Sequence, residues 1–178
     1  MMLKTKKRVF FIKLHYIYFS FFWSLKKAYL LLVLFLLLNF SSKSQQLQIA
    51  MELYQSQNYI QAINILEHLE ESDKQLFYLS KCYENISLEK SRDLKIYFIE
   101  NFKNSIFIDD IHSSLANIQY NSLEHSSCIG NYLKISRELT QKERFQLAYS
   151  FFVLQEYDKS SLIFKKLMSE KSVYKPSS

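Results

Sequence analysis

Hydroxyl and imidazole side chains, which nucleophilic and acid–base catalysis use, stand next to one another at two places in the sequence. Two serines follow His112 directly, and two more follow His125. Side chains one residue apart on a helix point in different directions, so sequence proximity alone does not bring a serine and a histidine into contact. Neither place therefore predicts a catalytic serine.

Paired acids occur as Glu70-Glu71 and Asp109-Asp110. Adjacent acids also diverge on a helix, and we interpret them as helix caps and solvated charge, with the aspartates suited to a first helical turn. The histidines lie far apart, without metal-ligand spacing to each other or to a cysteine: His15, His68, His112 and His125. We therefore predict no enzymatic activity, no metal and no cofactor.

The composition favours helices. Almost half of the residues (48%) are hydrophobic, which is enough for one domain with a real core. Gly130 and Pro176 are the only glycine and proline. Turn-rich β folds and phosphate-binding loops both need glycine, so the sequence predicts helices joined by short polar turns. Cys82 and Cys128 lie within helical patterns and are interpreted as buried thiols, although an exported protein could also pair them.

The net charge of +6 comes from the beginning of the chain. Residues 1–44 contain eight basic residues and no acid, which leaves 15 basic against 17 acidic residues in 45–178. The predicted folded part therefore has no basic stripe, and we predict that it does not bind nucleic acid.

Residues 1–44 are predicted to be a signal peptide or a membrane anchor. Lys26-Lys27 precede the apolar residues 28–40, and SSKSQQ follows, which is the order of an export signal with cleavage near Ser44. Residues 9–25 form a second apolar segment, interrupted by Lys13. Either the true start lies closer to Lys26, or both segments stay in the membrane. The sequence thus predicts an exported, periplasmic or envelope-associated protein, with membrane anchoring as the alternative.

From residue 45 onward the apolar residues recur with helical spacing. The pattern predicts helix pairs at 45–56 and 59–70, 74–85 and 90–103, 109–121 and 125–136, and 141–154 and 157–169. Short connections are typical of antiparallel helix neighbours. The predicted apolar faces include Ile49 and Ile60 in the first pair, Leu94 and Phe98 in the second, Ile129, Tyr132 and Leu133 in the third, and Phe145, Phe151 and Phe164 in the fourth.

Two stretches of the sequence are nearly the same. AMELYQSQNYIQAINIL begins at Ala50 and AYSFFVLQEYDKSSLIF begins at Ala148, so the offset is 98 residues. That offset is three periods of about 33 residues, a known length for helical repeats. The match predicts a repeat array, in which each helix pair needs its neighbours to bury its apolar face.

The residues that match in these stretches resemble the tetratricopeptide repeat. The matching positions are Ala50, Leu53, Tyr59, Ala62 and Leu66 in the first pair, and Ala148, Phe151, Tyr157, Ser160 and Phe164 in the last. The third pair matches more weakly and the second is degenerate. The resemblance, which is nearest to bacterial exported tetratricopeptide proteins, implies a short all-α solenoid of about four pairs over 45–170.

In such arrays the first helices line a concave groove, and the resemblance implies that a protein or peptide binds there. The implied partner-binding residues are Met51, Tyr54, Gln55, Lys81, Glu84, Asn85, Asn117, Tyr120, Asn121, Tyr149 and Phe152. Tyrosine and asparagine suit such surfaces, although the aromatic residues could instead pack against a neighbouring pair. Tetratricopeptide repeats that bind chaperones hold a carboxylate with several Lys and Arg side chains in the groove. Here only Lys81 takes such a position, so the sequence gives little support to that kind of binding.

The predicted function is a non-catalytic scaffold or adaptor of the cell envelope. The alternative is a small membrane protein with retained N-terminal spans and a helical tail. We expect 171–178 to be a tail, or the truncated start of a further repeat, because the last pair has no polar helix to cover its apolar side.

Overall fold

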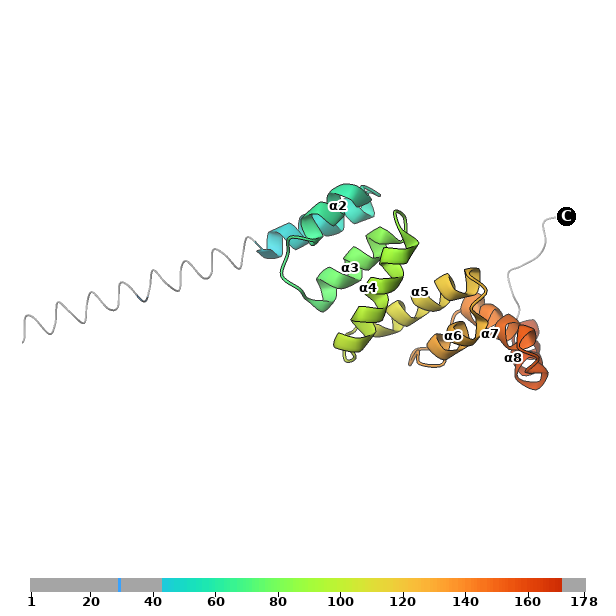
Figure 1. Cartoon of the computed structure of the whole chain (residues 1–178). Coiled ribbons are helices and arrows are strands. Elements are labelled where there is room, and N and C mark those ends of the chain that lie inside the picture. Colours follow the sequence, from blue (N-terminus) through green and yellow to red (C-terminus); the bar gives the residue numbers. More distant parts are fainter. Residues whose placement is uncertain (1–28, 30–42, 171–178) are drawn as a thin grey trace, which may run out of the picture. The chain divides into compact units, whose positions relative to one another are not determined.

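The computed structural model describes residue 29 and residues 43–170, and within them every regular element is helical (Figure 1). The chain divides into two compact units, Met1–Gln46 and Leu47–Ser178. No helix of the described residues is long and apolar enough to cross a bilayer. The predicted export signal or anchor lies outside these residues except for Tyr29 and 43–44, so it stays a prediction, as do the domain limits and the tail at 171–178.

Successive helices form hairpins that pack on their neighbours along the chain. Residues 43–55 are helical. The helices that follow are α2 (Tyr59–Leu66), α3 (Asp73–Tyr83), α4 (Leu88–Asn101), α5 (Ile108–Asn121), α6 (His125–Tyr132), α7 (Gln141–Val153) and α8 (Tyr157–Ser169). The helix that opens the third pair, α5, also contacts the opening helix of the fourth, α7. Contacts confined to near neighbours are the mark of a repeat array, and the all-α solenoid prediction is confirmed.

Polar side chains fix where several helices begin. Ser72 and Ser87 accept the backbone N–H of Gln75 and Lys90, at 3.2 and 3.4 Å. Thr140 opens α7 with a capping box, in which its hydroxyl accepts from the Glu143 N–H and the Glu143 carboxylate accepts from the Thr140 N–H. Each cap satisfies a backbone donor that has no partner inside its helix.

Three of the four hairpin turns contain a residue in the left-handed conformation. Gln57, Leu123 and Gln155 have φ of 63°, 61° and 63°. In each turn the next residue donates its N–H back to a carbonyl five residues earlier, as Glu124 does to Gln119 at 2.8 Å. Glycine usually takes this place because it has no Cβ. Since the sequence has one glycine, these turns carry the steric cost of an ordinary side chain, roughly 1 kcal/mol each.

The core consists of two clusters of buried side chains. The first runs from the helical residues 47–55 to α5 and includes Ala50, Leu66, Phe98 and Ile111. The second runs from α5 to α7 and includes Ala116, Cys128, Tyr132 and Phe151. The repeat-matched positions Ala50, Ala62, Ala148 and Ser160 are all buried. Small residues therefore let the two helices of a pair approach closely, as the repeat pattern predicts.

Both cysteines are buried and unpaired, which confirms the interpretation as packed thiols. Burial raises the pKa of the Cys82 thiol to about 11 and also raises that of Cys128. A thiol held in its protonated form is a poor nucleophile and a poor metal ligand.

Two second helices end about four residues earlier than predicted. The α6 helix stops at Tyr132, because the Asp109 carboxylate accepts the backbone N–H groups of Ser136 and Arg137, at 3.0 and 2.9 Å, and holds that segment outside the helix. Four predicted inward positions are wrong, because the structure exposes Ile49, Ile60, Leu133 and Phe145. Leu133 follows the last turn of α6, and Phe145 packs against the Phe164 ring of α8 with centroids 5.8 Å apart but keeps 49% of its surface exposed.

Candidate functional site

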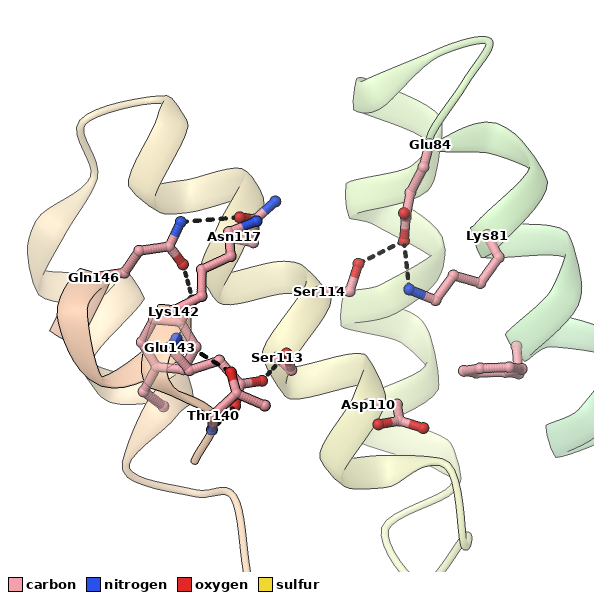
Figure 2. A pocket seen from close by; sticks show the side chains of 12 residues that line it. Lys81, Glu84, Asp110, Ser113, Ser114, Asn117, Thr140, Lys142, Glu143 and Gln146 are labelled. Atoms are coloured by element: carbon pink, nitrogen blue, oxygen red, sulfur yellow. Dashed lines mark hydrogen bonds and ion pairs between the residues drawn. The ribbon is translucent and has the colours of Figure 1, made fainter. Parts of the chain in front are cut away.

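A groove of about 330 Å³ runs across three successive opening helices, α3, α5 and α7. Figure 2 shows Lys81 and Glu84 on the α3 side, Ser113, Ser114 and Asn117 in the middle on α5, and Lys142, Glu143 and Gln146 on the α7 side. Phe77, Asp110, Tyr132 and Thr140 complete the lining. Hydroxyl, amide and charged groups dominate this surface.

Glu84 collects the polar groups at the α3 side of the groove. Its Oε1 lies 3.1 Å from Lys81 Nζ and 3.0 Å from Lys95 Nζ. The Ser114 hydroxyl of α5 donates to the same oxygen (Figure 2). Burial by itself would raise the pKa of Glu84, but Lys95 and Lys81 outweigh burial and the pKa is lowered. The carboxylate is therefore charged and joins α3 to α4 and α5.

Lys95 is a fully buried cation beneath the groove. Its ammonium donates to the Ser80 carbonyl oxygen at 3.3 Å and to the Ser91 hydroxyl, besides its contact with Glu84. All three ammonium donors are thus used. Burial lowers the pKa of Lys95 to about 8, against the opposing attraction of Glu84.

The Lys95 ammonium predicts a pH dependence of stability. Its pKa is about 8 in the folded chain, against an ordinary value of 10.5, so the unfolded chain binds more protons in this interval. The contribution of Lys95 to the free energy of unfolding should therefore rise with pH from about 8 upward, by roughly 1 kcal/mol between pH 8 and 9, and it is measured as the difference between the wild-type chain and Lys95→Met. Urea titrations at several pH values would measure this rise.

The Lys95→Met variant is the matched control and should show no such rise. The difference between the two proteins isolates Lys95, because the raised pKa values of Cys82 (about 11) and Cys128 lower the free energy of unfolding of both proteins equally as the pH approaches 9. The same rise in the Lys95→Met variant would mean that another group is responsible.

Glu143, at the start of α7, accepts a hydrogen bond from α5 as Glu84 does on the α3 side of the groove. Its carboxylate accepts from Arg137 Nη1 and Nη2, at 2.9 and 2.7 Å, and from the Ser113 hydroxyl of α5. The hydrogen bond from Arg137 is the largest cause that lowers the pKa of Glu143, to about 2. The bidentate guanidinium contact and the link to α5 hold the α7 end of the groove in place.

Amide groups bridge α5 and α7 in the upper part of the view in Figure 2. Gln146 Nε2 donates to Asn117 Oδ1 at 3.0 Å, and the buried Tyr132 hydroxyl donates to Gln146 Oε1. These bonds leave the Asn117 amide N–H groups without a protein acceptor among the described residues. The groove thus offers donors at this point that can bind an acceptor such as a peptide carbonyl.

The charged groups that remain for a ligand are few. Lys142 is exposed and makes no ion pair with the described residues, and Asp110 has only a 3.9 Å contact with Arg137. Glu84 and Glu143 already accept several hydrogen bonds each. The groove therefore presents a cation, an anion and amide donors that are not saturated by the protein, an arrangement suited to a polar, extended chain.

The structure does not bring serine and histidine together at His112. The His112 Nδ1 pairs with Asn131 Oδ1 at 2.7 Å, while the Ser113 hydroxyl donates to Glu143. His125 Nδ1 does lie 3.1 Å from the Ser150 hydroxyl, but both residues are buried. Within 29 and 43–170, no group of three or more His, Cys, Asp and Glu side chains could hold a metal ion.

Three of the predicted partner-binding residues, Lys81, Glu84 and Asn117, line the groove. Four others lie in aromatic clusters: Tyr54 packs against Tyr59 and Tyr78, and Tyr120, Tyr149 and Phe152 form a connected row of rings. Met51 is half-buried, whereas Gln55, Asn85 and Asn121 are exposed and do not line the groove. The role of all eleven in binding stays a prediction.

The groove residues that the sequence reading missed lie one or two turns closer to the helix N-termini. Ser113 and Asp110 precede Asn117 by four and seven residues, and Phe77 precedes Lys81 by four. Residues at these spacings share one face of a helix. Extending each predicted face by two turns toward its N-terminus would have found these residues, since the groove crosses α5 and α7 in their first halves.

Similar proteins are found at the level of structure. No protein-family model matches the sequence, and no curated protein matches it either. A solved structure of MamA (AMB-1, P212121 crystal form) has a TM-score of 0.63 and 12% identity, covering 72% of this chain and 73% of that chain. MamA from MSR-1 in the C2 form has 0.60 and 12%, over 72% and 76% of the two chains.

A further MamA crystal structure has a TM-score of 0.58 and 14% identity, over 71% of this chain and 72% of that chain. Identities this low establish the fold alone. MamA is a tetratricopeptide-like helical repeat protein, which agrees with the residues at the repeat-matched positions. The described part of this chain therefore has the tetratricopeptide-like helical repeat fold that the sequence predicted.

Proposed function

We propose that this protein is a non-catalytic scaffold that binds an extended protein or peptide segment in the groove of α3, α5 and α7. The tetratricopeptide-like fold supports a protein-interaction role in general. The observation that supports this particular site is the continuity of the groove across three opening helices, with about 330 Å³ of space. A groove that crosses successive repeats would let an extended chain contact each repeat in turn.

The chemistry of the groove indicates how such a segment would be held. The free Asn117 N–H groups would donate to a peptide carbonyl, and Lys142 and Asp110 would contact side chains of opposite charge. Glu84 and Glu143 fix the two sides of the groove before a ligand arrives, because their hydrogen bonds link α5 to the two neighbouring hairpins. A preformed groove lowers the entropic cost of binding.

We place this scaffold at the cell envelope, on the basis of Lys26-Lys27 and the apolar residues 28–40. Mass spectrometry of the mature N-terminus would separate a cleaved export signal from a retained anchor. An intact residue 1 would contradict cleavage and favour the membrane-anchored alternative.

Site-specific photocrosslinking in cells that produce the full chain would test the groove. A benzoylphenylalanine at Lys142, inside the groove, should give a discrete protein adduct, and one at the exposed Lys103 should not. The Asn117→Ala change should reduce the adduct several-fold, because it removes the free donors. The exposed Asn104 is the matched control, and Asn104→Ala should leave the adduct unchanged. Equal adducts from 142 and 103, none from 142, or no effect of Asn117→Ala would contradict the proposed site.

A further inference from the structure

Three polar side chains from three different helices form a hydrogen-bonded row at one side of the groove. The Tyr132 hydroxyl of α6 donates to Gln146 Oε1 on α7, and Gln146 Nε2 donates to Asn117 Oδ1 on α5 at 3.0 Å (Figure 2). We refer to these three residues as the amide network. Tyr132 and Gln146 are 1% and 5% exposed, whereas Asn117 is half-buried. Asn117 is therefore the member of the network that a ligand in the groove can contact.

The Tyr132 hydroxyl fixes the direction of the hydrogen bonds in the amide network. A phenol has one proton to donate, and among the described residues Gln146 is the hydrogen-bond partner of this hydroxyl. If Gln146 were rotated so that Nε2 faced Tyr132, the phenol proton would be buried without an acceptor, which is strongly unfavourable. Burial also raises the pKa of Tyr132, so the proton stays on the phenol oxygen at neutral pH. Gln146 therefore presents Oε1 to Tyr132 and Nε2 to Asn117.

The direction of the network decides which atoms of Asn117 face the groove. Because Gln146 offers a donor, Asn117 must turn its acceptor, Oδ1, toward Gln146. The Nδ2 hydrogens of Asn117 have no acceptor among the described residues and are left for a ligand. An asparagine without such a partner can rotate and offer either group to a ligand. Here the amide is held in one orientation by a proton on another helix.

We propose that Tyr132 and Gln146 are positioning residues that make the groove selective for a hydrogen-bond acceptor at Asn117. The inference rests on the proposed function, because it concerns how the same groove holds an extended segment. A free backbone N–H of that segment would meet the Asn117 N–H groups, and neither donor would be satisfied. The bound segment therefore places a free backbone carbonyl, and not an N–H group, against α5 at Asn117.

The Gln146→Glu change reverses the amide network without changing the length of the side chain. An ionised carboxylate accepts at both oxygens, so it would accept from Tyr132 and also from Asn117 Nδ2, whose partner Oδ1 would then face the groove. A protonated carboxyl would restore the original direction, because its O–H group donates to Asn117 Oδ1.

The carboxyl introduced at position 146 should titrate within an accessible range of pH. Burial raises the pKa of such a carboxyl above the ordinary glutamate value of about 4.3. The charged side chains nearby are Glu143, its partner Arg137 and the exposed Lys142, and they act in both directions. The titration is therefore followed from about pH 4 to 9.

Exchange of side-chain amide hydrogens with water, measured by NMR on the full chain, would test the orientation of Asn117 without a ligand. In the unsubstituted chain both Asn117 Nδ2 hydrogens should exchange about as fast as those of the exposed Asn104, the internal reference, at every pH. In Gln146→Glu one Asn117 hydrogen should exchange about fivefold more slowly than the reference above the pKa of the new carboxyl. This protection should disappear as the carboxyl is protonated, a reversal that a merely structural role would not produce.

Photocrosslinking from position 142 would test whether this orientation matters for binding. In permeabilised cells buffered above the measured pKa, Gln146→Glu should reduce the adduct several-fold, as Asn117→Ala does, because a ligand carbonyl would meet Oδ1. Tyr132→Phe removes the proton that sets the direction, so the adduct should fall about twofold. Gln146→Met has a similar length but no hydrogen bonds, and since it leaves Asn117 free to rotate, it should reduce the adduct less than Gln146→Glu.

Two results would overturn the inference. One is exchange of the Asn117 hydrogens that Gln146→Glu leaves unchanged at every pH. The other is protection of Asn117 in Gln146→Glu together with an adduct as strong as in the unsubstituted chain, because the orientation would then not affect binding. Absence of any adduct from the unsubstituted chain would contradict the proposed function instead, and the exchange measurement would still decide whether Tyr132 and Gln146 orient Asn117.

Discussion

The Glu84→Ala variant should lose about 2 to 3 kcal/mol of unfolding free energy at pH 7 in urea denaturation, from the uncompensated charge of Lys95 and the lost hydrogen bond of Ser114. Lys95 is fully buried, and Glu84 provides the only carboxylate within ion-pair distance of its ammonium among the described residues. Without Glu84 the cation keeps two neutral acceptors, on Ser80 and Ser91, and its desolvation is no longer offset. The part of the loss that comes from the Lys95 charge has a limit of about 1.4 kcal/mol at pH 7, since the pKa of Lys95 is about 8 in the folded chain and releasing its proton costs roughly 1.4 kcal/mol per pH unit below that pKa.

The double variant Glu84→Ala with Lys95→Met is the control for this prediction. Methionine has a similar length and no charge, so the double variant should recover most of the lost stability. Lys95→Met alone should be neutral or stabilising, because Glu84 keeps Lys81 and the Ser114 hydroxyl and lies partly in solvent. If the double variant is as unstable as Glu84→Ala, the loss comes from the Glu84 side chain itself and the buried-charge explanation is wrong.

The Phe98→Ala variant should lose about 3 to 5 kcal/mol, measured in the same way. Phe98 is fully buried on α4 and packs against Phe102 with ring centroids 5.4 Å apart. The α4 helix contacts both α3 and α5, so the cavity opens between adjacent hairpins in the middle of the array. Because an array is held together by contacts between neighbours, this substitution should also lower the cooperativity of unfolding.

Two other substitutions on α4 serve as controls for the cavity that Phe98→Ala creates. Phe98→Leu keeps most of the volume and should cost less than about 1.5 kcal/mol. Ile96→Ala removes an apolar side chain that is 42% exposed, two positions away, and should cost about 1 kcal/mol or less. Equal losses for Ile96→Ala and Phe98→Ala would show that the loss of apolar contact in general, rather than the cavity at Phe98, determines the effect, because alanine itself favours the helix.

The helices and their pairing could be predicted from the sequence because the information is local. Apolar residues at helical spacing, the shortage of glycine and the repeated stretches at Ala50 and Ala148 were sufficient for the all-α repeat fold. The two stretches indeed place Ala50 and Ala148 in equivalent buried environments. Helix ends were predicted less well, because the end of α6 depends on a hydrogen bond from Ser136 to Asp109, 27 residues away in sequence.

The candidate groove could be predicted only in part. The sequence indicated that the opening helices would share a face, and three of the residues assigned to that face, Lys81, Glu84 and Asn117, line the groove. It did not indicate that the groove would cross the end of α3 and the first halves of α5 and α7. How far along each helix a neighbour lies is determined by packing between hairpins, which no local spacing records.

By itself, the sequence determined that this chain forms stacked helix hairpins, because helical periodicity and small residues at close contacts are properties of neighbouring residues. Only the tertiary structure decided which charges are buried and which apolar rings are left open. The sequence predicts Phe145 as a core residue and does not distinguish Lys95 from the other lysines. Lys95 is buried because Glu84 and the Ser80 carbonyl of another helix supply partners for its charge, and Phe145 stays 49% exposed because its side chain contacts mainly the neighbouring rings of Tyr149 and Phe164.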